Sequence, residues 1–178
     1  MRKYFFILLV ASYMSYTDIL VDISQQRLFV LDNGGTLIVS YPISSSYFGE
    51  GQVENSFKTP LGKHVIKQKI GSDASKNIIF KERINTGRYA EIHHTDYDSD
   101  EDHVTSRILW LEGLEEGFNK GGNVDSFNRY IYIHGTPEEG LIGKKASHGC
   151  IRMFNHDVIE LYDLCLLYTS PSPRDVST

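Results

Sequence analysis

The chain has 178 residues, of which 40% are hydrophobic and 23% are charged, a composition that suits one soluble globular domain with its own core. Its 18 basic and 23 acidic residues give a net charge of −5, which argues against a nucleic-acid partner held by electrostatic attraction. No apolar run reaches the length of an ordinary membrane-spanning helix.

Residues 1–16 have the layout of a secretory signal. Arg2 and Lys3 form a basic start, Tyr4 to Ala11 form a short apolar run, and small residues follow. A buried first strand is the alternative interpretation of such a short run. We expect an exported protein of the periplasm or cell envelope, in which this segment, cleaved or kept as an anchor, is the only contact with a membrane.

The segment that follows is rich in β patterns. Ile19, Val21 and Ile23 alternate with polar residues, and two further β-rich runs flank Asn33-Gly34, which predicts a tight hairpin turn with positive φ at both turn positions. Further strands are expected over residues 63–70, 78–80, 108–111 and 130–134, and a tight turn with Pro60 at its second position is expected over residues 58–62.

The only convincing helix begins at Asn155, a residue suited to capping. Val158, Leu161 and Tyr162 would share one face of it. With so few and such short helices, the chain is expected to be mainly β.

Glu91–His103 holds six carboxylates and three histidines. A calcium loop would have a glycine after its acidic triplet and a glutamate at its end, and neither is present. The segment is therefore predicted to be a solvated loop.

The residues that can carry chemistry lie between Ile131 and Met153. His134 ends a β run, Ser147-His148-Gly149-Cys150 follows, and Arg152 comes next. An imidazole can take the proton of a thiol or stabilise the thiolate, and on a strand His148 would share a face with Cys150. Gly149 allows close approach of a substrate, and the N–H groups around Gly149 and Cys150 can bind an oxyanion.

Other interpretations of these residues remain open. Two histidines and a cysteine are a possible zinc set, although no glutamate stands where zinc hydrolases have their general base. In an exported protein, a disulfide between Cys150 and Cys165 is the default expectation. A lone cysteine or histidine is also often only a packing residue.

The stretch SHGCIRM, preceded by YIYIHGT, resembles the signature of L,D-transpeptidase catalytic domains of the YkuD type. The segments KTPLGK at residues 58–63 and TSRILWL at residues 105–111 are similar to two further stretches of that family. The resemblance covers residues 17–164. It implies a β-sandwich-like domain, an active site in a cleft beneath a mobile lid, and one short helix after the catalytic motif.

The resemblance also implies roles for individual residues. Cys150 is similar to the nucleophile and His134 to its base, with the Gly135 carbonyl orienting the ring. His148, Gly149 and Cys150 are similar to the oxyanion-hole segment and Ser147 to its supporting hydroxyl, and Arg152 is expected to bind a substrate carboxylate. Which of the two imidazoles takes the proton is left open by the sequence.

The implied reaction is a two-step acyl transfer. Cys150 attacks the carbonyl after the L-centre of diaminopimelate in a peptidoglycan tetrapeptide stem, D-alanine leaves, and an amine of a second stem resolves the thioester. Attachment of a lipoprotein lysine and hydrolysis are alternatives that share this acyl-enzyme. No metal or organic cofactor is implied. A non-catalytic wall-binding module is the other alternative, against which the intact Cys150, His134 and His148 set argues.

Residues 165–178 are expected to be a non-native tail. Cys165 to Asp175 read CLLYTSPSPRD, which is what a transposase adapter used in sequencing libraries encodes. We therefore expect the helix to end near Leu164, Cys165 not to be a native partner for Cys150, and the last strand of the family to be missing. A native disordered tail is the alternative.

Overall fold

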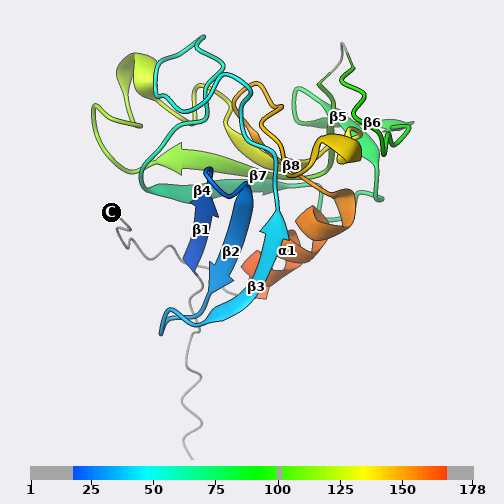
Figure 1. The fold of residues 1–178 in the computed structure, drawn as a ribbon, viewed down its shortest axis with the longest axis horizontal. Coiled ribbons are helices and arrows are strands. Elements are labelled where there is room, and N and C mark those ends of the chain that lie inside the picture. Colours follow the sequence, from blue (N-terminus) through cyan, green and yellow to red (C-terminus); the bar gives the residue numbers. More distant parts are fainter. Residues whose placement is uncertain (1–17, 100–101, 168–178) are drawn as a thin grey trace, which may run out of the picture.

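A computed structural model describes residues 18–99 and 102–167, which form two β-sheets, one α-helix and two short 3₁₀ helices (Figure 1). The expected signal at residues 1–16 and residues 168–178 of the expected tail lie outside the described residues. Within the described part of the chain, no helix has the length and apolar character needed to cross a membrane.

The first sheet is a three-stranded antiparallel meander, as the alternating pattern predicts. Its strands are β1 (Asp18–Asp22), β2 (Arg27–Leu31) and β3 (Leu37–Pro42).

The turn between β2 and β3 differs from the expected two-residue hairpin. Positive φ occurs at Gly35 (81°) and not at Asn33 or Gly34. The Asp32 carboxylate accepts the N–H groups of Gly34 and Thr36, each at 2.8 Å, and the Gly35 N–H donates to the Asp32 carbonyl. An aspartate at the start of a turn can anchor the loop through its side chain, so the left-handed residue falls one position later than predicted.

The second sheet has six strands in the order β6-β5-β7-β8-β9, with β4 also paired to β7. The bounds are β4 (His64–Ile70), β5 (Ile78–Lys81), β6 (Ile84–Tyr89), β7 (Val104–Gly113), β8 (Tyr132–Gly135) and β9 (Ile151–Met153). The sequence predicts four of them, and β6 and β9 are additional. In place of the expected tight turn around Pro60, Thr59 forms an isolated β-bridge with Glu50 and the chain bends at Gly62.

The long central strand β7 separates two hydrophobic clusters. Leu109 and Leu111 pack into the larger cluster, between the two sheets and the helix. Ile108 and Trp110 point to the opposite face and pack with Tyr132, Phe80 and Ile78. Because side chains alternate along a strand, β7 supplies one wall of each cluster.

The helix α1 (Asn155–Leu167) packs against β7 and β8 and lies to the right of β3 in Figure 1. Val158, Leu161 and Tyr162 are buried, as predicted. Asn155 starts the helix, but its side chain bonds to the hydroxyls of Thr105 and Ser106 and to the Thr136 carbonyl. It therefore joins the helix to β7 and to the chain after β8, instead of capping it.

The helix also continues beyond the expected end at Leu164. Cys165 follows Leu161 by one helical turn and packs against the larger cluster, so the apolar face persists through this position. The short 3₁₀ helices are η1 (Gly122–Val124) and η2 (Glu139–Leu141).

Candidate active site

Cys150 lies immediately before β9, against the segment that enters β8. Its Sγ accepts the Tyr132 N–H and donates to the Tyr130 carbonyl, both at 3.4 Å. Burial raises the pKa of the thiol to about 12, and the Tyr132 N–H, Arg152 and Arg129 oppose this only in part. At neutral pH the resting group is therefore a thiol, and attack requires a base that removes its proton.

His134 provides an imidazole with the properties of such a base. It lies on β8 with 1% of its surface exposed, and its Nδ1 is 2.7 Å from the Gly135 carbonyl. A carbonyl can only accept, so Nδ1 carries the proton and Nε2 has a lone pair. Among the residues that the structure describes, none forms a hydrogen bond with Nε2. Burial lowers the pKa of His134 below its ordinary value, although Asp102 opposes this, so the ring is neutral.

Strand register places His134 on the same face of the sheet as the thiol. In β7–β8 pairing His134 lies opposite Ile108, and directly opposed residues point to the same side. Ile108 belongs to the smaller cluster, against which Cys150 also packs. His134 and Cys150 therefore share one face of the second sheet.

His148 occupies a different environment. Residues 148–150 form a bend and not the expected strand, so His148 does not share a strand face with Cys150. Its side chain is 51% exposed, its Nδ1 is 3.1 Å from a carboxylate oxygen of Asp102, and its ring lies 6.0 Å from the rings of Phe48 and Phe57.

Arg152 is held by two carboxylates. Its Nη1 is 2.6 Å from Glu138 Oε2 and its Nη2 is 2.8 Å from Asp102 Oδ1. The Arg152 side chain is 1% exposed, so its guanidinium presents no open face to a substrate carboxylate. The structure instead makes Arg152 a link between Asp102 and the segment after β8.

Ser147 and Gly149 shape the backbone around the thiol. The Ser147 hydroxyl accepts the Gly149 N–H at 3.3 Å and donates to the Cys150 carbonyl at 2.5 Å. Gly149 has φ of 122°, where a side chain is strained. Within the described residues, the N–H groups of His148 and Cys150 have no hydrogen-bond partner. These two donors are available to an oxyanion formed at the thiol.

The model of the L,D-transpeptidase catalytic domain family, YkuD, matches residues 16–173. The chain belongs to the YkuD family of L,D-transpeptidase catalytic domains. A search of curated proteins found no match.

The fold is similar to that of a solved L,D-transpeptidase. The enzyme from Mycobacterium smegmatis superposes with a TM-score of 0.50 at 18% identity, covering 84% of this chain and 54% of that one. L,D-transpeptidase 1 of Mycobacterium tuberculosis gives a TM-score of 0.42 at 16% identity, covering 84% of this chain and 57% of the other. The chain thus spans about half the length of these relatives. The mainly β class and the single α-helix after the motif are confirmed for the described residues.

The L,D-transpeptidase domain has site residues that sequence reasoning missed. Asp102 belongs to the Glu91–His103 loop, most of which is exposed as expected, yet its carboxylate lies between His148 and Arg152. Burial raises the pKa of this carboxyl, but Arg152, His134 and His148 outweigh burial and hold the pKa below its ordinary value. Asp102 is therefore a fixed negative charge, and no motif of the sequence marks it.

Arg129 is a second such residue. It donates to the carbonyls of Gln52 at 2.8 Å and Lys58 at 2.6 Å. The Lys58 carbonyl is 3.5 Å from the position that a Cβ would take at Gly149. Arg129 thus holds the chain after β3 against the bend that contains Gly149. Its positive charge also lowers the pKa of Cys150, in opposition to burial.

A zinc site would need three donor side chains close together. In the described part of the chain, no group of three histidine, cysteine or acidic side chains is placed to hold a metal ion. Cys150 and Cys165 are both free thiols.

Proposed function

We propose that this domain is a peptidoglycan L,D-transpeptidase that works through an acyl-enzyme on Cys150. The observation that carries the proposal is that the Cys150 thiol and the buried His134, whose Nε2 has a lone pair that can accept a proton, lie on the same face of one sheet. Family membership supports the class of substrate, a peptide stem of the cell wall.

In the first step His134 Nε2 takes the proton of Cys150 while Sγ attacks the carbonyl of the third residue of a tetrapeptide stem. The oxyanion that forms is stabilised by the N–H groups of His148 and Cys150. The C–N bond to D-alanine then breaks, the imidazolium returns its proton to the leaving amine, and a thioester remains.

In the second step an amine of another stem attacks the thioester carbonyl. His134 removes a proton from that amine and returns it to the departing sulfur, so the thiol is regenerated and a peptide crosslink is formed. A lipoprotein lysine and a water molecule are the other acceptors that the same thioester accommodates. Since stems lie outside the cytoplasmic membrane, the proposal also includes export to the periplasm or cell envelope.

Incubation of the purified protein with tetrapeptide muropeptides, followed by mass spectrometry, tests the proposal. We expect release of D-alanine and a crosslinked dimer. If the products contain tripeptide but no dimer, the enzyme is a hydrolase. If product forms only when a lysine-bearing lipoprotein peptide is added, the reaction is lipoprotein attachment.

Cys150→Ser should abolish all products while the protein still folds, because a serine hydroxyl is far less acidic than a thiol and barely differs from it in volume. Unchanged activity of that variant would contradict the proposal.

Two further measurements check the thiol chemistry. A carbapenem carries a strained carbonyl that mimics the acyl donor, so intact-mass analysis should show one adduct, located by digestion on Cys150. Treatment with a chelator should leave activity unchanged, whereas a loss that zinc restores would favour a metal hydrolase.

A further inference from the structure

The guanidinium of Arg83 stacks on two aromatic rings, those of Trp110 and Tyr130. It is 4.9 Å from each ring centre, and its Nη1 donates to the Tyr132 hydroxyl at 3.2 Å. Trp110 is in turn fixed by stacking on Phe127 at 4.0 Å. A guanidinium that stacks on aromatic rings keeps its edge available for other hydrogen bonds.

Two of the three residues that hold Arg83, Tyr130 and Tyr132, also contact Cys150. The Tyr130 carbonyl and the Tyr132 N–H each lie 3.4 Å from Cys150 Sγ. The path from the thiol to Arg83 therefore follows one tyrosine, from its backbone N–H to its hydroxyl. Between its backbone nitrogen and its hydroxyl oxygen the tyrosine spans about 7 Å by standard bond lengths, and hydrogen bonds of 3.4 Å and 3.2 Å join its two ends to Cys150 Sγ and to Arg83.

The hairpin that carries Arg83 adopts a costly backbone conformation. Glu82 and Arg83, the turn between β5 and β6, have φ of 50° and 70°. Such a turn favours asparagine and glycine, and backbone strain at other residues is often associated with function. The strained turn directs Arg83 back over Trp110.

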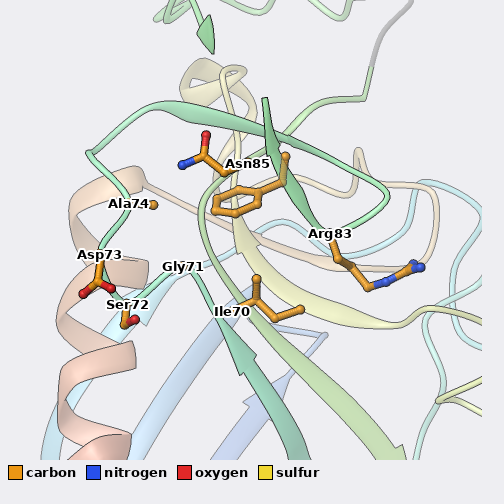
Figure 2. A pocket seen from close by; sticks show the side chains of 8 residues that line it. Ile70, Gly71, Ser72, Asp73, Ala74, Arg83 and Asn85 are labelled. Carbon is orange, nitrogen blue, oxygen red and sulfur yellow. The ribbon is translucent and has the colours of Figure 1, made fainter. Parts of the chain in front are cut away.

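Glu82, next to Arg83 in the chain, acts on its charge electrostatically but forms no ion pair with it. Among the described residues, no acidic side chain forms an ion pair with it, whereas Arg152 has two such partners. Arg83 also lines an open pocket of about 290 Å³, at the end opposite Asp73 (Figure 2). Figure 2 shows its guanidinium turned away from Ser72 and Asp73.

We propose that Arg83 binds the side-chain carboxylate of the diamino acid at the third position of the acyl-donor stem. This inference rests on the proposed function. In a diaminopimelate residue, six bonds separate the scissile carbonyl carbon from the side-chain carboxylate carbon, an extended span of about 7 Å that matches the span of the tyrosine. The carboxylate of the leaving D-alanine is only about 4 Å from that carbonyl, too close to reach Arg83. A planar guanidinium can bind the carboxylate through two parallel hydrogen bonds.

Two synthetic donors test the proposal. One is the tetrapeptide with a free side-chain carboxylate on its diaminopimelate, and the other carries an amide there. With Arg83→Gln we expect kcat/KM for the carboxylate donor to fall at least tenfold, mainly through KM, while kcat/KM for the amidated donor is unchanged. Arg83→Lys should retain part of the preference, since it keeps the charge but not the bidentate geometry. Arg88→Gln is the matched control, because it removes the charge of an exposed arginine on the same hairpin, and it should leave both donors unaffected.

The outcomes separate this proposal from the function on which it rests. Equal losses on both donors, with a lowered melting temperature, would show that Arg83 only stabilises the hairpin, and an unchanged preference would remove it from the substrate site. Either result overturns the subsite and leaves the transpeptidase in place. If the parent protein consumes neither donor, the proposed function fails and the subsite fails with it.

Discussion

The two imidazoles near Cys150 differ in burial and in partner. His134 is 1% exposed with a carbonyl behind Nδ1, whereas the His148 side chain is 51% exposed and faces Asp102. A buried ring held in one tautomer loses little entropy when it accepts a proton at the other nitrogen. We assign the base to His134 and a role in shaping the oxyanion donors to His148.

Replacement of each histidine by alanine checks this assignment. His134→Ala should slow acylation of Cys150 by 10²–10⁴-fold, the usual contribution of a general base. His148→Ala should cost about tenfold or less, because it removes a side chain but not the backbone donors. Rates of acylation followed by intact mass would measure both, and a larger loss at His148 would reverse the roles.

The negative charge of Asp102 acts on both His134 and Cys150. It raises the pKa of each of these groups. Its own pKa is held below the ordinary value, so it remains ionised throughout the neutral range.

Asp102→Asn should therefore move the acidic limb of the pH profile of kcat/KM. Without the carboxylate the pKa of His134 falls, so the neutral base persists to lower pH and the limb shifts in that direction. Asp96→Asn is a suitable control, because Asp96 lies in the same loop and pairs with exposed Lys144. A limb that stays in place, or moves to higher pH, would show that Asp102 does not act on the base.

At the scale of elements, β9 depends on an ion pair that crosses to the chain after β8. Arg152 and Glu138 are each 1% exposed and are joined at 2.6 Å. A buried charge that loses its partner remains desolvated and uncompensated.

Arg152→Ala should lower the free energy of unfolding by about 3–5 kcal/mol, the usual cost of breaking a buried pair from one side. Lys67→Ala breaks the pair with Glu112, in which the lysine side chain is 53% exposed, and should cost about 1 kcal/mol or less. Urea denaturation of the three proteins would show the difference. Equal losses would mean that the Arg152 pair is solvated.

The sequence predicts elements well where apolar residues repeat at a regular spacing. The first sheet and the start of α1 follow from such patterns. Strand β6 does not, because all its residues are exposed and it has no alternation to read. β9 is too short to show a pattern, and its place is set by parallel pairing with β8.

The site divides in the same way. Cys150, His134 and the Gly135 carbonyl come from a local motif, and the structure places His134 Nδ1 beside that carbonyl. Asp102 and Arg129 do not, because their contacts with the site depend on tertiary folding of distant segments. The role of Arg152 could not be predicted from its place in the motif. Its guanidinium is enclosed by the carboxylates of Asp102 and Glu138, which come from other segments of the chain.

At the scale of the whole molecule, the two faces of the second sheet differ. One face packs into the larger hydrophobic cluster, and the other carries the proposed catalytic residues. The first face meets the three-stranded sheet and α1 through the larger cluster. The second face bears His134, Cys150 and the smaller cluster of Trp110 and Tyr132. Neighbouring positions on β7 therefore affect different properties of the protein.

Leu109 and Ile108 test this difference. Both are fully enclosed, at 0% and 1% exposure, so Leu109→Ala and Ile108→Ala should each lower the free energy of unfolding by about 2–5 kcal/mol. Leu109 faces the larger cluster, and its loss should leave kcat/KM of the folded protein unchanged. Ile108 lies opposite His134 and packs in the cluster that supports Cys150, and a displacement of these groups by even about 1 Å can cost 10²-fold in rate. Its loss should lower kcat/KM by at least tenfold when measured well below the melting temperature. If both variants lose stability but keep the same kcat/KM, the smaller cluster does not position the site.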